Sequence, residues 1–129
     1  MGLIDFVERE TGSGFKITNP NEPVRVRPLS AEELRAMHDS GQALELFDVR
    51  PDVERNKAKI DWAKKLDREG QDYLFSLPRE TPIAFYCHHG LRSRSAAEHF
   101  LAEGFREVYN LEGGIDAWSR VADPGVPRY

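Results

Sequence analysis

The sequence predicts an α/β protein built on a mostly parallel sheet with helices on both faces. Short apolar runs alternate with segments of helical periodicity from residue 24 onward, a pattern typical of βαβ units. The run 82–86 is apolar throughout, as expected of a central strand that is buried on both faces. The 129 residues, of which 40% are hydrophobic and 31% charged, suit a single soluble domain.

The first predicted strand, 24–26, is short and is placed at an edge of the sheet. Ser30 and Glu33 then have the spacing of a capping box, in which each side chain bonds the backbone N–H of the other residue. A helix is expected to begin there and to end near Gly41. The apolar run 44–49 predicts the next strand.

The middle of the chain predicts two helices around a short strand. The charged stretch 52–59 is expected to be helical, 63–66 to be a strand, and 69–77 a helix that ends before Pro78.

After the central strand, residues 93–103 carry apolar side chains at helical spacing, and Gly104 is expected to end that helix. The segment 108–110 predicts the last strand. A Gly-Gly turn then leads into a final helix, whose apolar residues are Ile115, Ala117, Trp118 and Val121.

Residues 1–23 differ from the rest of the chain, because turn-like stretches at 11–14 and 19–23 interrupt two short apolar runs. We expect an N-terminal extension or linker over 1–23 and a single folded domain over 24–129.

Composition excludes several classes of protein. No apolar run approaches the ~20 residues of a membrane span, and acidic residues interrupt the N-terminus where a secretory signal would be apolar. The net charge of −4 disfavours nucleic-acid binding. A single cysteine cannot form an internal disulfide, so we expect a cytoplasmic protein that binds neither membrane nor nucleic acid.

That cysteine, Cys87, follows the central strand, at the sheet edge where parallel α/β proteins bind ligands. The backbone amides of the next residues can curl into a nest for an anion, Gly90 permits a positive φ there, and a helix begins near Ser93. Arg92 adds a full positive charge. We expect the sulfur to be exposed and these features to favour the thiolate, which is the nucleophilic form. The alternative is an inert buried cysteine.

The segment from Cys87 to Ser93, Cys-His-His-Gly-Leu-Arg-Ser, resembles the active-site loop of the rhodanese family of sulfurtransferases. The resemblance runs from about Val24 to Trp118. It includes Phe-Asp-Val-Arg at 47–50 and Asn-Leu-Glu-Gly-Gly-Ile-Asp-Ala-Trp at 110–118. It implies an α/β fold with a central five-stranded parallel sheet.

The resemblance also implies a mechanism. Cys87 would take the outer sulfur of a donor such as thiosulfate as a persulfide, and would pass it to cyanide or a thiol in a ping-pong exchange. Arg92 would hold the anionic donor, while Asp48 would hold neighbouring loops and Arg50 would give electrostatic support. The loop residues expected to bind substrate are His88, His89, Gly90, Leu91 and Ser93. No cofactor or metal is implied.

Three other functions use the same residues. A phosphatase or arsenate reductase also brackets a loop with Cys and Arg, but those families place five residues between the two, and here there are four. A non-catalytic persulfide carrier or redox sensor needs the same activated thiol. His88 and His89 are metal-ligand types, although adjacent histidines seldom bind one metal and we expect them to shape the loop.

Two segments complicate the resemblance. At 58–63 the chain has Ala-Lys-Ile-Asp-Trp-Ala where many rhodaneses have Gly-His-Ile-Pro-Gly-Ala. Residues 12–21 are similar to the tail of A-type iron–sulfur scaffold proteins, as in fusions of glutaredoxin, A-type and rhodanese domains, but lack cluster-binding cysteines. A protein partner from thiol or iron–sulfur metabolism is therefore a hypothesis.

Overall fold

The computed structural model describes residues 24–129. Their centre is a five-stranded sheet in the order β1-β5-β4-β2-β3, in which every neighbouring pair is parallel. The strands are β1 (Arg27–Leu29), β2 (Glu45–Asp48), β3 (Lys64–Lys65), β4 (Ile83–Tyr86) and β5 (Val108–Leu111). The predicted fold class and strand number are confirmed.

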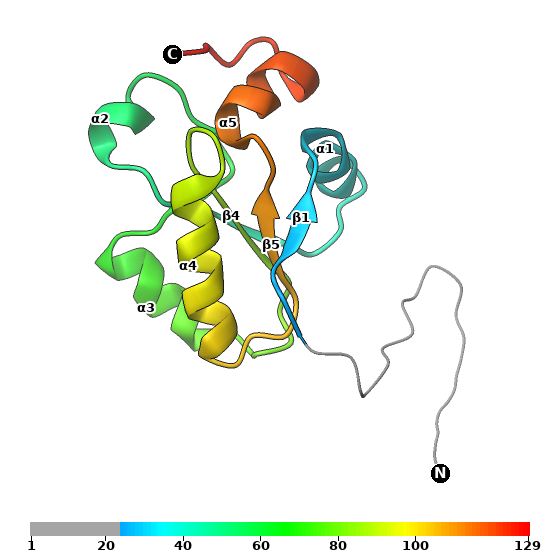
Figure 1. Ribbon diagram of the computed structural model, residues 1–129, viewed down its shortest axis with the longest axis vertical. Coiled ribbons are helices and arrows are strands. Elements are labelled where there is room, and N and C mark those ends of the chain that lie inside the picture. The colour runs from blue at the N-terminus through cyan, green and yellow to red at the C-terminus, as the bar shows by residue number, and fades with distance from the viewer. Residues whose placement is uncertain (1–23) are drawn as a thin grey trace.

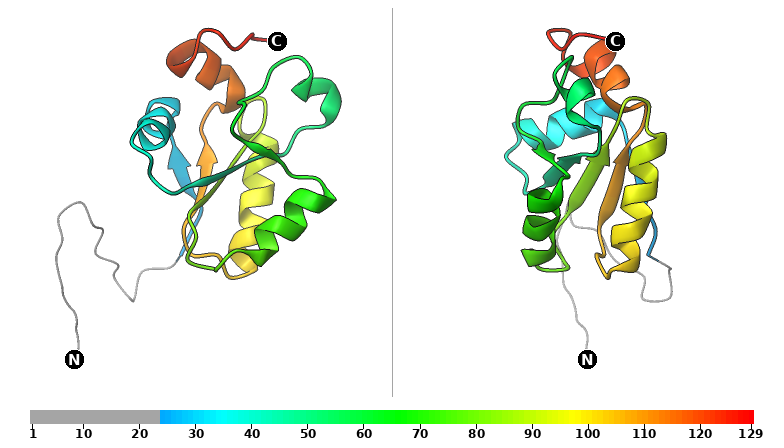
Figure 2. Two further views of the ribbon diagram at one scale, coloured as in Figure 1. Left: turned by 180° about the vertical axis from the view of Figure 1, so that it is seen from behind. Right: turned by 90° about the vertical axis from the view of Figure 1, so that its left-hand side faces the viewer.

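Helices connect these strands and cover the sheet (Figures 1 and 2). They are α1 (Ala31–Asp39), α2 (Asp52–Arg55), α3 (Arg68–Ser76), α4 (Leu91–Ala102) and α5 (Gly114–Ala117), which continues as a π-helical turn, Trp118–Ala122. The rings of Phe75 in α3 and Phe100 in α4 lie 5.3 Å apart, so these two helices are neighbours.

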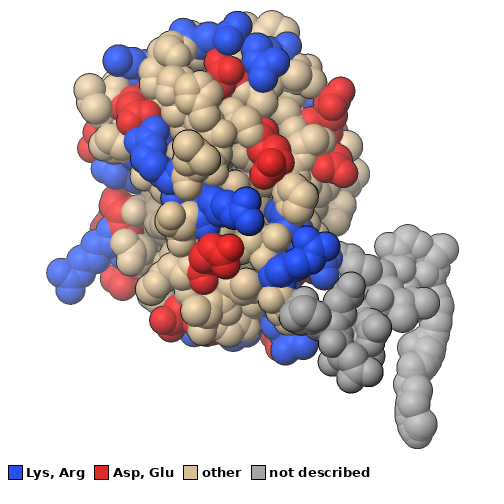
Figure 3. Space-filling model, viewed as in Figure 1, with Lys and Arg blue, Asp and Glu red and all other residues tan. Residues whose placement is uncertain are grey.

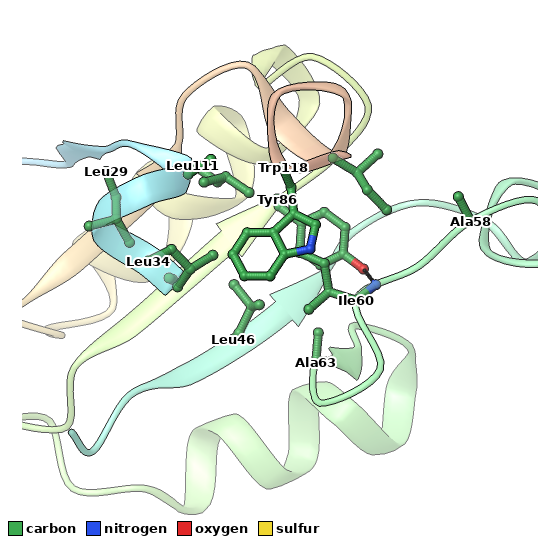
Figure 4. Packing of buried hydrophobic residues seen from close by; sticks show 12 residues of the cluster. Leu29, Leu34, Leu46, Ala58, Ile60, Ala63, Tyr86, Leu111 and Trp118 are labelled. Atoms are coloured by element: carbon green, nitrogen blue, oxygen red, sulfur yellow. Dashed lines mark hydrogen bonds between the residues drawn. The ribbon is translucent and has the colours of Figure 1, made fainter. Parts of the chain in front are cut away.

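Strand β4 divides the core into two apolar clusters, because successive side chains of a strand point to opposite faces. Ile83 and Phe85 belong to the cluster under α3 and α4. Ala84 and Tyr86 belong to the cluster under α1 and α5, where Trp118 packs beside Tyr86 (Figure 4). Every residue of β4 is buried, which confirms the prediction of a central strand.

The capping box at the start of α1 is present as expected. The amide of Glu33 donates to Ser30 Oγ at 3.0 Å, and the amide of Ser30 donates to Glu33 Oε1 at 2.8 Å.

Two predicted elements are displaced or shortened. The first strand lies at Arg27–Leu29 and not at 24–26, because pairing with β5 places Leu29 in the core while Val24 stays 44% exposed. The helix expected over 52–59 is limited to Asp52–Arg55.

Candidate active site

Cys87 directly follows β4, in a loop that lies with α2 and α5 at one end of the sheet (Figure 1). The residue is only 1% exposed. An exposed sulfur was expected from the sequence, and that expectation is wrong: the loop folds over the side chain.

The loop nevertheless directs its dipoles at the sulfur. The amides of Gly90 and Ser93 donate to Cys87 Sγ at 3.1 and 3.3 Å. Burial disfavours the charged form, but the hydroxyl and amide of Ser93 and the amide of Gly90 outweigh it, so the pKa of the Cys87 thiol is lowered. The amide of Arg92 contributes in the same direction. Gly90 has φ of 103°, which confirms the positive φ expected there.

Asn110, near the end of β5, holds this loop through side-chain hydrogen bonds. Its Nδ2 donates to the carbonyl of Gly90 at 3.0 Å, and its Oδ1 accepts from Ser93 Oγ at 2.5 Å. Ser93 Oγ also lies 3.3 Å from Cys87 Sγ. A hydroxyl has one proton, so Asn110 and the sulfur compete for it. No separate role was predicted for Asn110 from the sequence, because its contacts with Gly90 and Ser93 are long-range.

The turn between β5 and α5 fixes the two carbonyls at the start of the loop. The amide of Ile115 donates to the Cys87 carbonyl at 2.8 Å, and that of Asp116 to the His88 carbonyl at 3.2 Å. Gly114 makes this approach possible: a Cβ there would lie 2.4 Å from the Cys87 carbonyl oxygen.

Arg92 is engaged by a partner that the sequence did not suggest. Its Nη1 and Nη2 donate to the two carboxylate oxygens of Glu54 in α2, at 2.7 and 2.8 Å. The arginine side chain is 48% exposed and that of the glutamate 19%. The guanidinium also interacts with the charge of Cys87.

Asp48 and Arg50 form a fully buried ion pair beneath the site. Arg50 donates to both carboxylate oxygens of Asp48, from Nε at 3.0 Å and from Nη2 at 2.8 Å. The same carboxylate accepts from Tyr86 at 2.7 Å. Arg50 also donates to the carbonyl of Ala58 at 2.7 Å. The pair thus ties β2 to the segment that precedes β3.

His88, His89 and Leu91 occupy the outer side of the loop, where Leu91 is 81% exposed. The His88 ring stacks on Tyr129 at 3.9 Å, and its Nε2 lies 2.8 Å from the Tyr129 carbonyl oxygen. Ligand atoms of His88, His89 and Asp116 lie within 4.8 Å of one another. However, Arg120 and Arg128 already pair with the Asp116 carboxylate, so its negative charge is compensated and attracts a metal ion only weakly.

A polar cleft of about 240 Å³ is lined in part by Asn110. Its lining includes two arginines, Arg25 and Arg94, but also Glu112. Basic and acidic side chains are likewise mixed over the face that carries α4 (Figure 3). Neither surface is a continuous basic field of the kind that nucleic acids require.

Comparison with known proteins assigns the fold and the loop to a family. The rhodanese-like domain model matches residues 30–121, and the chain therefore belongs to the rhodanese-like family. It is 31% identical over 131 residues to the probable adenylyltransferase/sulfurtransferase MoeZ of Mycobacterium tuberculosis, covering 98% of this chain but 33% of that protein.

Two further relatives are closer in length. The thiosulfate sulfurtransferase GlpE of Shewanella oneidensis is 31% identical over 91 residues, which is 70% of this chain and 89% of that protein. The crystal structure of a rhodanese-like domain protein from Staphylococcus aureus has a TM-score of 0.65 at 27% identity and covers 81% of this chain and 99% of its own. The relatives indicate a sulfurtransferase family.

Among residues 24–129, none of the helices is both long and apolar enough to cross a bilayer.

Proposed function

We propose that this protein transfers sulfane sulfur through a persulfide on Cys87. The observation that carries the proposal is the convergence of the Gly90 and Ser93 amides on Sγ, which lowers the pKa of the thiol and so favours the thiolate. The same donors suit the negative charge that a persulfide carries. Family membership and the sulfurtransferase relatives support the same chemistry.

With thiosulfate as donor, the Cys87 thiolate attacks the outer sulfur. A sulfur–sulfur bond forms to Cys87, the bond between the two sulfurs of the donor breaks, and sulfite leaves with the electron pair. An acceptor thiolate or cyanide then attacks the outer sulfur of the persulfide and releases the Cys87 thiolate. The two half-reactions make a ping-pong exchange.

The other loop residues support these steps. Arg92 would bind the anionic donor once its contact with Glu54 is broken. Asp48 and Arg50 are positioning residues that hold the backbone beneath the site. His88, His89 and Leu91 lie on the outer side of the loop, and we propose that they contact the donor or acceptor.

The proposal extends to the setting of the reaction. A small anionic donor and a thiol acceptor fit a cytoplasmic protein with one cysteine. A partner protein from thiol or iron–sulfur metabolism is proposed on the similarity of residues 12–21 alone, and these lie outside the described residues.

Intact mass spectrometry tests the chemistry. After incubation with thiosulfate we expect the mass of one added sulfur, lost when cyanide is added. The Cys87→Ser variant should gain nothing, because it lacks the nucleophile. A wild-type protein that never gains sulfur, or a Cys87→Ser protein that does, contradicts the proposal.

A persulfide carrier is the second candidate. The 1% exposure of Cys87 favours it, because a partner protein could open the loop on binding, whereas a small free acceptor could not. Steady-state turnover separates the two. An enzyme forms thiocyanate from thiosulfate and cyanide repeatedly, whereas a carrier accepts one sulfur and stops.

A further inference from the structure

The contact between Glu54 and Arg92 places a carboxylate of the protein where the anionic donor is expected to bind. Both terminal nitrogens of the guanidinium are engaged, each with its own carboxylate oxygen, at 2.7 and 2.8 Å. This paired geometry is also the one by which arginine binds an oxyanion. A donor that uses both nitrogens therefore has to replace Glu54.

Glu54 is held in place by more than Arg92. The hydroxyl of Tyr129 donates to Glu54 Oε1 at 2.6 Å, and the same hydroxyl accepts from Arg50 Nη1 at 2.8 Å. Arg50 in turn is fixed by its buried pair with Asp48. A carboxylate that a rigid network holds beside Arg92 acts at a high effective concentration.

The glutamate is ionised over the whole neutral range. The hydrogen bond from Arg92 is the main cause that lowers the pKa of Glu54 to about 2, and the bond from Tyr129 acts in the same direction.

We propose that Glu54 determines donor specificity, as an internal carboxylate that occupies Arg92 until an oxyanionic sulfur donor displaces it. The inference rests on the proposed function. Apparent affinity for a donor is reduced by the fraction of protein in which Arg92 is occupied. Glu54 thus selects for donors whose anionic group binds a guanidinium more strongly than a carboxylate does.

The test replaces the charge and keeps the shape, with Glu54→Gln. We expect the KM for thiosulfate to fall about fivefold, the factor that a modest partly exposed ion pair represents, with kcat within about twofold because the persulfide chemistry is unchanged. Glu98→Gln is the matched control, since Glu98 pairs with Arg94 on the exposed side of α4, the helix that also carries Arg92. It should leave KM unchanged.

Two further measurements separate this proposal from the proposed function. Sulfate, an unreactive oxyanion, should protect Cys87 from iodoacetamide at lower concentration in Glu54→Gln than in wild type, at constant ionic strength. In an Arg92→Ala background, Glu54→Gln should no longer improve the KM or the protection, because the interaction that it releases is already absent.

The outcomes are distinct. If thiosulfate adds no sulfur to either protein, the proposed function fails, while sulfate protection still tests Glu54. If the protection and the KM are unchanged in Glu54→Gln, or if the improvement persists without Arg92, Glu54 does not compete with the donor. Melting temperatures of all variants show whether each protein is folded.

Discussion

The sulfur of Cys87 is subject to two opposed influences. Near-complete burial favours the neutral thiol, while the amides of Gly90 and Ser93 favour the thiolate. The second influence prevails, and the pKa is lowered. Burial also limits how fast any reagent can arrive, so the charge of the sulfur and its accessibility have to be measured separately.

Alkylation by iodoacetamide across pH makes that separation. Only the thiolate reacts, so a lowered pKa moves the midpoint of the rate profile below the ~8.5 of a free cysteine, and the maximal rate reports access. Ser93→Ala removes a hydroxyl that lies 3.3 Å from Sγ and should move the midpoint to higher pH. A wild-type midpoint at or above that of a free cysteine would show that the loop does not activate the sulfur.

Helix α5 has only four residues, yet its first amides hold the cysteine loop. The approach depends on Gly114, whose φ is +59° and whose missing Cβ leaves room for the carbonyls of Cys87 and His88. The turn and the loop are therefore one mechanical unit, although Gly114 and Cys87 are 27 positions apart in the sequence.

Alanine at two glycines tests this unit. Gly41→Ala introduces only the strain of a positive φ, since nothing lies within 4 Å of the added Cβ, and should cost about 1 kcal/mol of unfolding free energy. Gly114→Ala adds a backbone overlap to the same strain and should cost at least about 2 kcal/mol more. Urea denaturation measures both. Equal losses of unfolding free energy in the two variants would mean that the loop shifts to accommodate the added Cβ at little cost.

The described residues contain two apolar clusters on opposite faces of one sheet, and strand β4 supplies both. The five strands and the helices named above all lie within residues 24–129, the part of the chain that the structure describes. Residues 24–129 thus bury an apolar cluster on each face of the sheet.

We therefore predict that a chain beginning at Val24 folds by itself. Its thermal midpoint should lie within about 3 °C of that of the full chain, which corresponds to less than 1 kcal/mol for a domain of this size, and thiosulfate should still add one sulfur to Cys87. Circular dichroism and intact mass measure the two properties. A large drop in the midpoint would assign residues 1–23 to the folded domain.

Local patterns predicted most of the fold. The capping box of Ser30 and Glu33 and the apolar run of β4 depend on neighbours in sequence, and both were predicted correctly. Strand β1 was misplaced, because its position depends on pairing with the distant β5. Helix α2 is shorter than its charge pattern suggested. Beyond the helix, the carbonyl of Ala58 accepts a hydrogen bond from the side chain of Arg50.

The loop conformation of the candidate site could be predicted from the sequence, but the residues that contact the loop could not. Gly90 has the conformation expected of it, while the catalytic roles that the loop motif suggested for Cys87 and Arg92 stay predictions. Glu54, Asn110 and Tyr129 reach the site from other parts of the chain. A lone glutamate, asparagine or tyrosine carries no local signal of such a contact. The roles of these three residues could therefore be seen only in the folded structure.

The enclosure of the sulfur has a bearing on its durability. Peroxides convert exposed thiolates to sulfenic acid and then irreversibly to higher oxides. These 129 residues contain no second thiol that could trap the first product as a disulfide. Because Cys87 is only 1% exposed, its burial is what limits the access of peroxides to the sulfur. A loop opening that admits a donor therefore also exposes the sulfur to oxidants while the loop is open.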